Sequence, residues 1–127
     1  MSGGVSAIAD AARAAVGTRF RVHGRGPDGL DCVGLVAVAL RAGGYAGAVP
    51  TGYSLRGGDP GVLDRVLVRV VDAAPGDVLL MAAGPGQFHL GIRTPGGFVH
   101  ADAGLRRVVE RPGVPPWPVL GAWRMPV

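Results

Sequence analysis

The chain has 127 residues, of which 48% are hydrophobic and 17% charged, and its formal net charge at pH 7 is +4. This length and composition predict one ordered domain over residues 1–127 and exclude an intrinsically disordered chain. All 13 basic residues are arginine, scattered along the sequence with Arg106 and Arg107 as the one adjacent pair. A nucleic-acid-binding surface needs clustered basic residues, so we expect no nucleic-acid partner.

The N-terminal segment does not resemble a secretory signal peptide. It has no basic start, and Asp10 and Arg13 interrupt its apolar run. No stretch reaches the roughly 18 apolar residues that a membrane-spanning helix needs, so we expect synthesis in the cytoplasm and no membrane span. Cys32 is the single cysteine, which excludes an internal disulfide bond.

Two helices are predicted in the first third of the chain. Apolar residues recur at helical spacing over residues 5–16, and residues 17–30 are rich in Gly, Pro and Asp, as in a loop. Asp31 is a suitable N-cap for a second helix over residues 32–41, which stops before a Gly-Gly pair. The second helix is apolar nearly all round, so we expect it to be buried.

The remaining chain predicts an antiparallel sheet. Residues 44–60 read as irregular and 61–65 as a short helix, after which short β-prone runs alternate with Pro/Gly turns. These runs lie at residues 66–71, 77–81, 89–93, 98–101, 107–110 and 119–127. Helices followed by antiparallel strands indicate an α+β domain.

The position of Cys32 suggests a nucleophile. It falls in the first turn of the second predicted helix, directly after the Asp31 cap. Unpaired backbone N–H groups and the positive end of the helix dipole stabilise a thiolate there, so we expect the pKa of Cys32 to be lowered. This stretch alone leaves open that Cys32 is an inert core residue.

Two histidines flank a predicted hairpin turn. His89 and His100 lie in β-prone runs separated by the sequence TPGG, whose Pro-Gly pair suits the centre of a tight turn. The resulting register pairs Gly91 with His100 and His89 with Asp102, with all four side chains on one face. We therefore expect the two histidines to lie within reach of each other.

A cysteine beside two converging histidines is the pattern that nucleophilic catalysis needs. We expect Cys32 to attack, His89 to take and return the proton, and His100 to orient the His89 ring, with Asp102 as the reserve candidate for that last role. The cysteine and the two histidines are also possible zinc ligands, but their spacing matches no structural zinc motif. We therefore expect neither a metal nor a cofactor.

Four segments in order resemble the NlpC-type cell-wall cysteine peptidases, which have a papain-like fold. They are VGTRFRVHGRGPDG, LDCVGLV, APGDVLLM and the pair HLGI and FVHA, and together they cover nearly the whole chain. The resemblance implies the same nucleophile, base and third residue: Cys32, His89 and His100. It also implies a substrate, the stem peptides of peptidoglycan, cut between D-γ-glutamyl and meso-diaminopimelic acid.

The substrate-binding candidates include two departures from the family pattern. Phe20 stands where the family usually has a tyrosine near the oxyanion site, and Val33 replaces a serine that helps to line the substrate pocket. The backbone N–H of Cys32 remains as an oxyanion donor. Asp31 and the loop residue His23 complete the substrate-binding candidates, although a loop histidine without function is the simpler interpretation.

The same resemblance extends to compact peptidases encoded with phage tails and gene-transfer particles. It implies action on the cell wall or in the periplasm, with delivery by such a particle. A non-catalytic tail-tip protein and a papain-like acyltransferase are the alternatives. Arg25 and Arg93 are candidates for binding a stem-peptide carboxylate, and Trp117 and Trp123 are expected to pack at the sheet edge.

Overall fold

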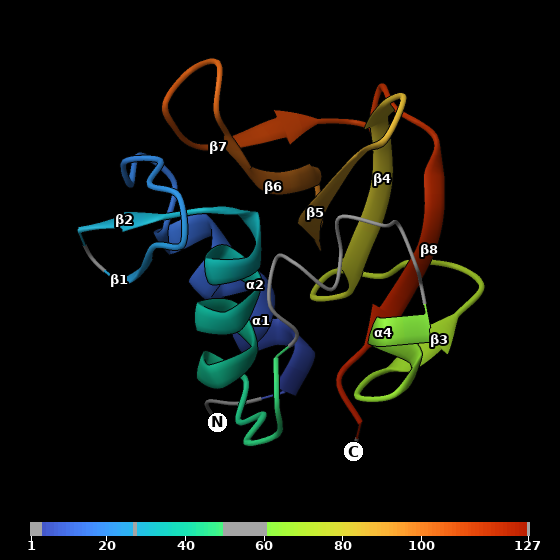
Figure 1. The fold of residues 1–127 in the computed structure, drawn as a ribbon. Helices are drawn as coiled ribbons and strands as arrows, with labels where there is room; N and C mark the ends of the chain where they lie inside the picture. Colours follow the sequence, from blue (N-terminus) through green and yellow to red (C-terminus); the bar gives the residue numbers. More distant parts are fainter. Residues whose placement is uncertain (1–3, 27, 50–60, 127) are drawn as a thin grey trace.

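The structure, a computed structural model, describes residues 4–26, 28–49 and 61–126. Both long helices form as predicted: α1 spans Gly4–Ala14 and α2 spans Cys32–Ala42. They lie side by side at one side of the molecule (Figure 1).

Burial follows the apolar pattern of the two helices. Ile8 and Ala12 of α1, at helical spacing, are fully buried. Most of α2 is buried as well, which confirms that it is a central helix.

The predicted loop between the helices contains two short paired segments. β1 (Arg25–Gly26) and β2 (Gly29–Leu30) form an antiparallel pair, which the sequence analysis did not predict. Phe20 pairs with Leu30 in an isolated bridge. Of the segment expected to be irregular, residues 44–49 carry no helix or strand, and residues 50–60 lie outside the described part.

The C-terminal half forms a six-stranded sheet with the order β3-β8-β4-β5-β6-β7, and every neighbouring pair is antiparallel. The predicted short helix precedes it as α4, Gly61–Asp64. The strands are β3 (Val68–Val70), β4 (Val78–Gly84), β5 (Gln87–Thr94), β6 (Gly97–Asp102), β7 (Arg107–Pro112) and β8 (Val119–Arg124). The α+β prediction is therefore confirmed.

The hairpin of β5 and β6 has the predicted register as far as the histidines. Gly91 lies opposite His100 and Thr94 opposite Gly97. The pairing of β5 with β6 ends at Gly91 and His100, whereas β6 stays paired with β7 as far as Asp102. The expected pair of His89 with Asp102 is therefore wrong. The two strands part before they reach this pair, because His89 stays paired with Met81 of β4 and Asp102 with Arg107 of β7.

The two faces of the sheet pack against different neighbours. Leu90 and Val99 belong to the main core with the helices, whereas Phe98 belongs to a smaller cluster on the other face. Because side chains alternate along a strand, His89 and His100 lie on the face of Phe98. Cys32, the first residue of α2, packs against the main core.

Candidate active site

Asp31 fixes the start of α2. One carboxylate oxygen, Oδ1, accepts the N–H of Gly34 at 2.7 Å, and the other, Oδ2, accepts the N–H of His23 at 2.8 Å. The loop lies directly against the helix, because a Cβ on Gly34 would overlap the carbonyl oxygen of Gly24. Asp31 thus joins the loop to the first turn and holds Cys32 in place, while both of its oxygens already have partners.

Cys32 does not have the lowered pKa that its helix position led us to expect. Burial raises the pKa of the thiol, and the charge of Asp31 raises it further. Hydrogen bonds from the backbone at Leu90 and Val33 act in the opposite direction. Loss of hydration outweighs the helix N-terminus, so in the absence of substrate the sulfur is held as a thiol. Its chemistry therefore requires a base.

The structure brings His89 and His100 together. Nε2 of His89 lies 2.8 Å from Nδ1 of His100, and the two rings meet nearly at right angles, with 4.9 Å between their centroids. The hairpin register explains the contact, since the two side chains are diagonal neighbours on one face. The hydrogen bond occupies one ring nitrogen of His89 and leaves Nδ1 for another partner.

Burial keeps both rings uncharged at neutral pH. It lowers the pKa of His89, against an opposing effect of Asp102. Burial and the neighbouring His89 lower the pKa of His100 to about 4. If the shared proton is on His89, then Nδ1 of His89 carries a lone pair that can accept a proton, and neutral His100 carries its own proton on Nε2. That Nε2 atom is buried and has no hydrogen-bond partner within the described residues.

Asp102 does not hydrogen-bond either histidine in the part of the chain that the structure describes. Its Oδ1 atom accepts the N–H of Leu105 at 3.0 Å, within the turn after β6. Its charge raises the pKa of both histidines, but the direct partner of His89 is His100.

The other predicted site residues have different surroundings. Phe20 is half-buried and, like Cys32, packs against the main core. Val33 is only 4% exposed, so its side chain offers little surface to a ligand. His23 is exposed and has a φ of +61°. Arg93 donates to the carbonyl oxygens at both ends of the β5–β6 turn, so its guanidinium already has partners there.

Trp117 is a site residue that the sequence analysis missed. Its ring lies 5.8 Å from His89 and 5.5 Å from His100, measured between centroids, and is nearly perpendicular to both. Sequence offered no signal for this contact, because Trp117 follows β7 and lies far along the chain from both histidines. Trp123, in contrast, is fully buried as a packing residue, and its indole N–H donates to Asp64 at 2.8 Å.

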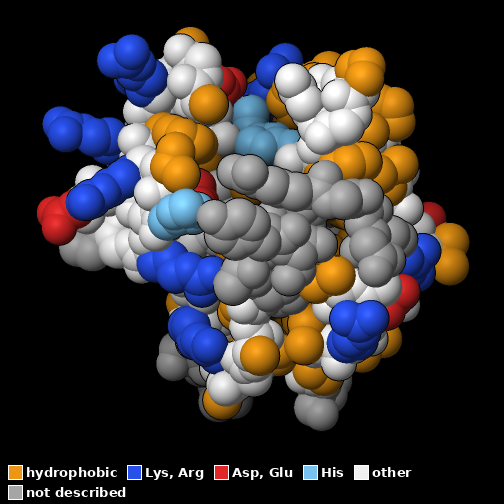
Figure 2. Space-filling view, in the orientation of Figure 1, with side chains coloured by type: hydrophobic (Ala, Val, Ile, Leu, Met, Phe, Trp, Pro, Cys, Tyr) orange, Lys and Arg blue, Asp and Glu red, His pale blue; other side chains and the backbone are white. Residues whose placement is uncertain are grey.

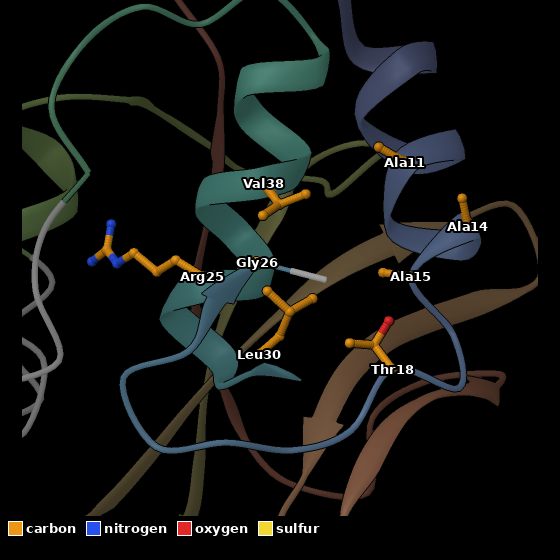
Figure 3. Close-up of a pocket in the computed structure, with 8 residues that line it drawn as sticks. All are labelled: Ala11, Ala14, Ala15, Thr18, Arg25, Gly26, Leu30 and Val38. Carbon is orange, nitrogen blue, oxygen red and sulfur yellow. The ribbon is translucent and has the colours of Figure 1, made fainter. Parts of the chain in front are cut away.

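The surface around these residues is uneven. Figure 2 shows histidine side chains on this face and arginines gathered along its left edge. A pocket of about 450 Å³ lies between α1, α2 and β1 (Figure 3), where Arg25 extends away from the small apolar residues that form most of the lining. Cys32 and the two histidines do not line this pocket. A second hollow of about 660 Å³ is lined by residues 17–21 and Asp28.

Among the described residues, no group of three or more His, Cys, Asp and Glu side chains has an arrangement able to hold a metal ion. No helix in the described ranges is long and apolar enough to cross a membrane.

The helices packed on an antiparallel sheet define an α+β fold of the papain-like class, as predicted. Among solved structures, this fold is that of NlpC/P60 proteins. NlpC1 from Trichomonas vaginalis is similar with a TM-score of 0.73 and 23% identity, over 92% of this chain and 42% of that one. NlpC2 from the same organism is similar with a TM-score of 0.74 and 21% identity, over 95% of this chain and 47% of that one.

A third similar structure is a single domain. The NlpC/p60 domain of the peptidoglycan hydrolase SagA gives a TM-score of 0.63 and 24% identity, over 85% of this chain and 88% of that domain. The chain therefore spans less than half the length of the two T. vaginalis proteins but most of the SagA domain. No family model and no curated protein sequence matches the chain.

Proposed function

We propose that the chain is a cysteine peptidase of the NlpC/P60 type that hydrolyses amide bonds in peptidoglycan stem peptides. The observation that carries this proposal is the 2.8 Å contact between His89 and His100. It leaves Nδ1 of His89 to accept a proton, which in this proposal comes from Cys32. The structural likeness to a peptidoglycan hydrolase domain supports the same conclusion.

The reaction follows from the atoms available. Nδ1 of His89 takes the proton of the Cys32 thiol as the sulfur attacks the amide carbon, and the backbone N–H of Cys32 stabilises the oxyanion. His89 then protonates the leaving amine, and the C–N bond breaks to give a thioester. Water, deprotonated by His89, attacks the thioester and releases the carboxylic acid and the thiol. His100 accepts the Nε2–H of His89 throughout and keeps the ring oriented.

An anionic substrate suits a surface on which several arginines gather. Arg19 forms an isolated bridge with Arg107, and the N–H of Phe20 donates to the carbonyl oxygen of Arg106 at 2.9 Å. These three arginines and Arg21 are exposed. Stem peptides carry free carboxylates, with which arginine pairs in a fork geometry. We propose that the bond cleaved is the one between D-γ-glutamyl and diaminopimelic acid. We place the activity at the cell wall, with delivery by a phage-like particle.

The test is a digest of purified diaminopimelate-type stem peptides followed by mass spectrometry. Wild-type protein should release new fragments, the Cys32→Ala variant none, and His89→Ala should be slower by about 10²–10⁴-fold. His100→Ala should also be impaired, whereas Asp102→Asn serves as the matched control and should stay within about tenfold of wild type, since its charge acts without a hydrogen bond.

Each outcome has a distinct meaning. Fragments from wild type alone would establish the peptidase and identify the bond. Products in which the acyl group has moved to an added amine would show an acyltransferase. Absence of cleavage across a panel of stems would refute the proposal and favour a structural tail-tip protein. If Asp102→Asn loses most of its cleavage activity while His100→Ala stays active, the third catalytic residue is Asp102 and not His100.

A further inference from the structure

The ring of Trp117 packs against both histidines and against Phe98. Besides its contacts with both histidines, its ring lies 6.2 Å from that of Phe98 at an interplanar angle of 76°. Phe98 in turn stacks on His100 at 5.2 Å. His100 is therefore enclosed by aromatic rings, which explains why it is only 1% exposed although its strand lies near one edge of the sheet.

The position of Trp117 is fixed from several directions. It is part of the sequence PPWP, where proline rings restrict the backbone on both sides. The carbonyl oxygen of Pro118 accepts the N–H of Ala82 at 2.9 Å, which ties the segment to β4. On the ring itself, the guanidinium carbon of Arg111 lies 5.5 Å from the centroid, a cation–π contact.

This placement affects the hydrogen bond between the histidines. Water that reached the pair would compete for Nε2 of His89 and Nδ1 of His100, and would stabilise a charged ring. In surroundings of low polarity the same hydrogen bond is stronger and both rings stay uncharged. Edge-to-face contacts also limit rotation of each imidazole.

We infer that Trp117 is a positioning residue, which holds the His89 and His100 rings in their mutual orientation and closes their hydrogen bond to water. The inference rests on the proposed function, in which His89 is the base, but its consequence for the rings is measurable without substrate. Trp117 acts through the histidines and makes no chemical contribution of its own.

The experiment is histidine-ring NMR of full-length wild type, Trp117→Ala and Trp117→Phe across the acid range, combined with the pH dependence of kcat/KM on stem peptides. In wild type, His100 should stay uncharged to about pH 4. In Trp117→Ala its pKa should rise towards the ordinary value of 6.5, with Trp117→Phe in between. The acid limb of kcat/KM should move in the same direction, and kcat should fall on the order of tenfold to a hundredfold.

Trp123→Phe is the matched control, because Trp123 is a fully buried tryptophan of the same sheet that packs in the main core, on the face opposite the histidines. It should lower stability and leave the titration of His100 as in wild type. A folded Trp117→Ala protein in which His100 titrates as in wild type would overturn the inference. If no variant cleaves any stem but the titration shifts as expected, the proposed function fails while the positioning role stands.

Discussion

Acid should weaken the fold through His100. The folded environment lowers the pKa of this ring from 6.5 to about 4, first because burial penalises the charged form and second because His89 is adjacent. In the unfolded chain the ring regains its ordinary value. Between these two values the unfolded state binds a proton that the folded state does not, so stability is full above pH 6.5 and is lost as the pH falls to about 4.

The size of the effect follows from the difference between the two pKa values, roughly 2.5, which corresponds to about 3 kcal/mol in the free energy of unfolding. Urea unfolding, followed by far-UV circular dichroism at about pH 7.5 and about pH 4.5, measures most of it. His100→Gln should be less stable than wild type at the higher pH, but its further loss on acidification should be smaller by about 2–3 kcal/mol. Carboxyl groups titrate in both proteins and cancel in this comparison. Equal losses would refute the argument.

Two further predictions concern the start of α2. Gly34→Ala should lower the free energy of unfolding by about 1–3 kcal/mol or more, because the added methyl group would overlap the carbonyl oxygen of Gly24. Urea unfolding measures this loss, and an unchanged midpoint would contradict the close approach of Gly24 to Gly34. Alkylation of Cys32 by iodoacetamide should increase with pH through a midpoint above the ordinary thiol value of 9.0, because burial raises its pKa; a midpoint below that value would show that the helix N-terminus outweighs burial.

Burial of Cys32, which raises the pKa of its thiol, changes how thiol labelling is to be understood. A slow cysteine in the protein without substrate does not by itself exclude catalysis, because in the proposed mechanism His89 takes the proton of the thiol only during attack. Cleavage of stem peptides is therefore the decisive assay, and labelling reports on the burial of the sulfur.

Much of the site could be predicted because its determinants are local. The N-cap Asp31 and the apolar run after it specify where α2 begins, and hence that Cys32 occupies a first turn. The Pro-Gly turn sets the register that places Gly91 opposite His100. Turn chemistry and side-chain periodicity act over a few residues, so they can be read without knowing the rest of the fold.

Tertiary structure decided what depends on distant neighbours. Asp102 failed to pair with His89 because the β5–β6 ladder ends at Gly91 and His100, while each strand stays paired with its other neighbour. Val33 is buried, and Trp117 covers His100, through packing between segments far apart in the sequence. The sequence by itself determined which residues stand at the helix start and on the hairpin face, since those positions depend on local geometry. The protonation of Cys32 and His100 was decided only by the folded chain, because loss of hydration depends on every segment packed around them.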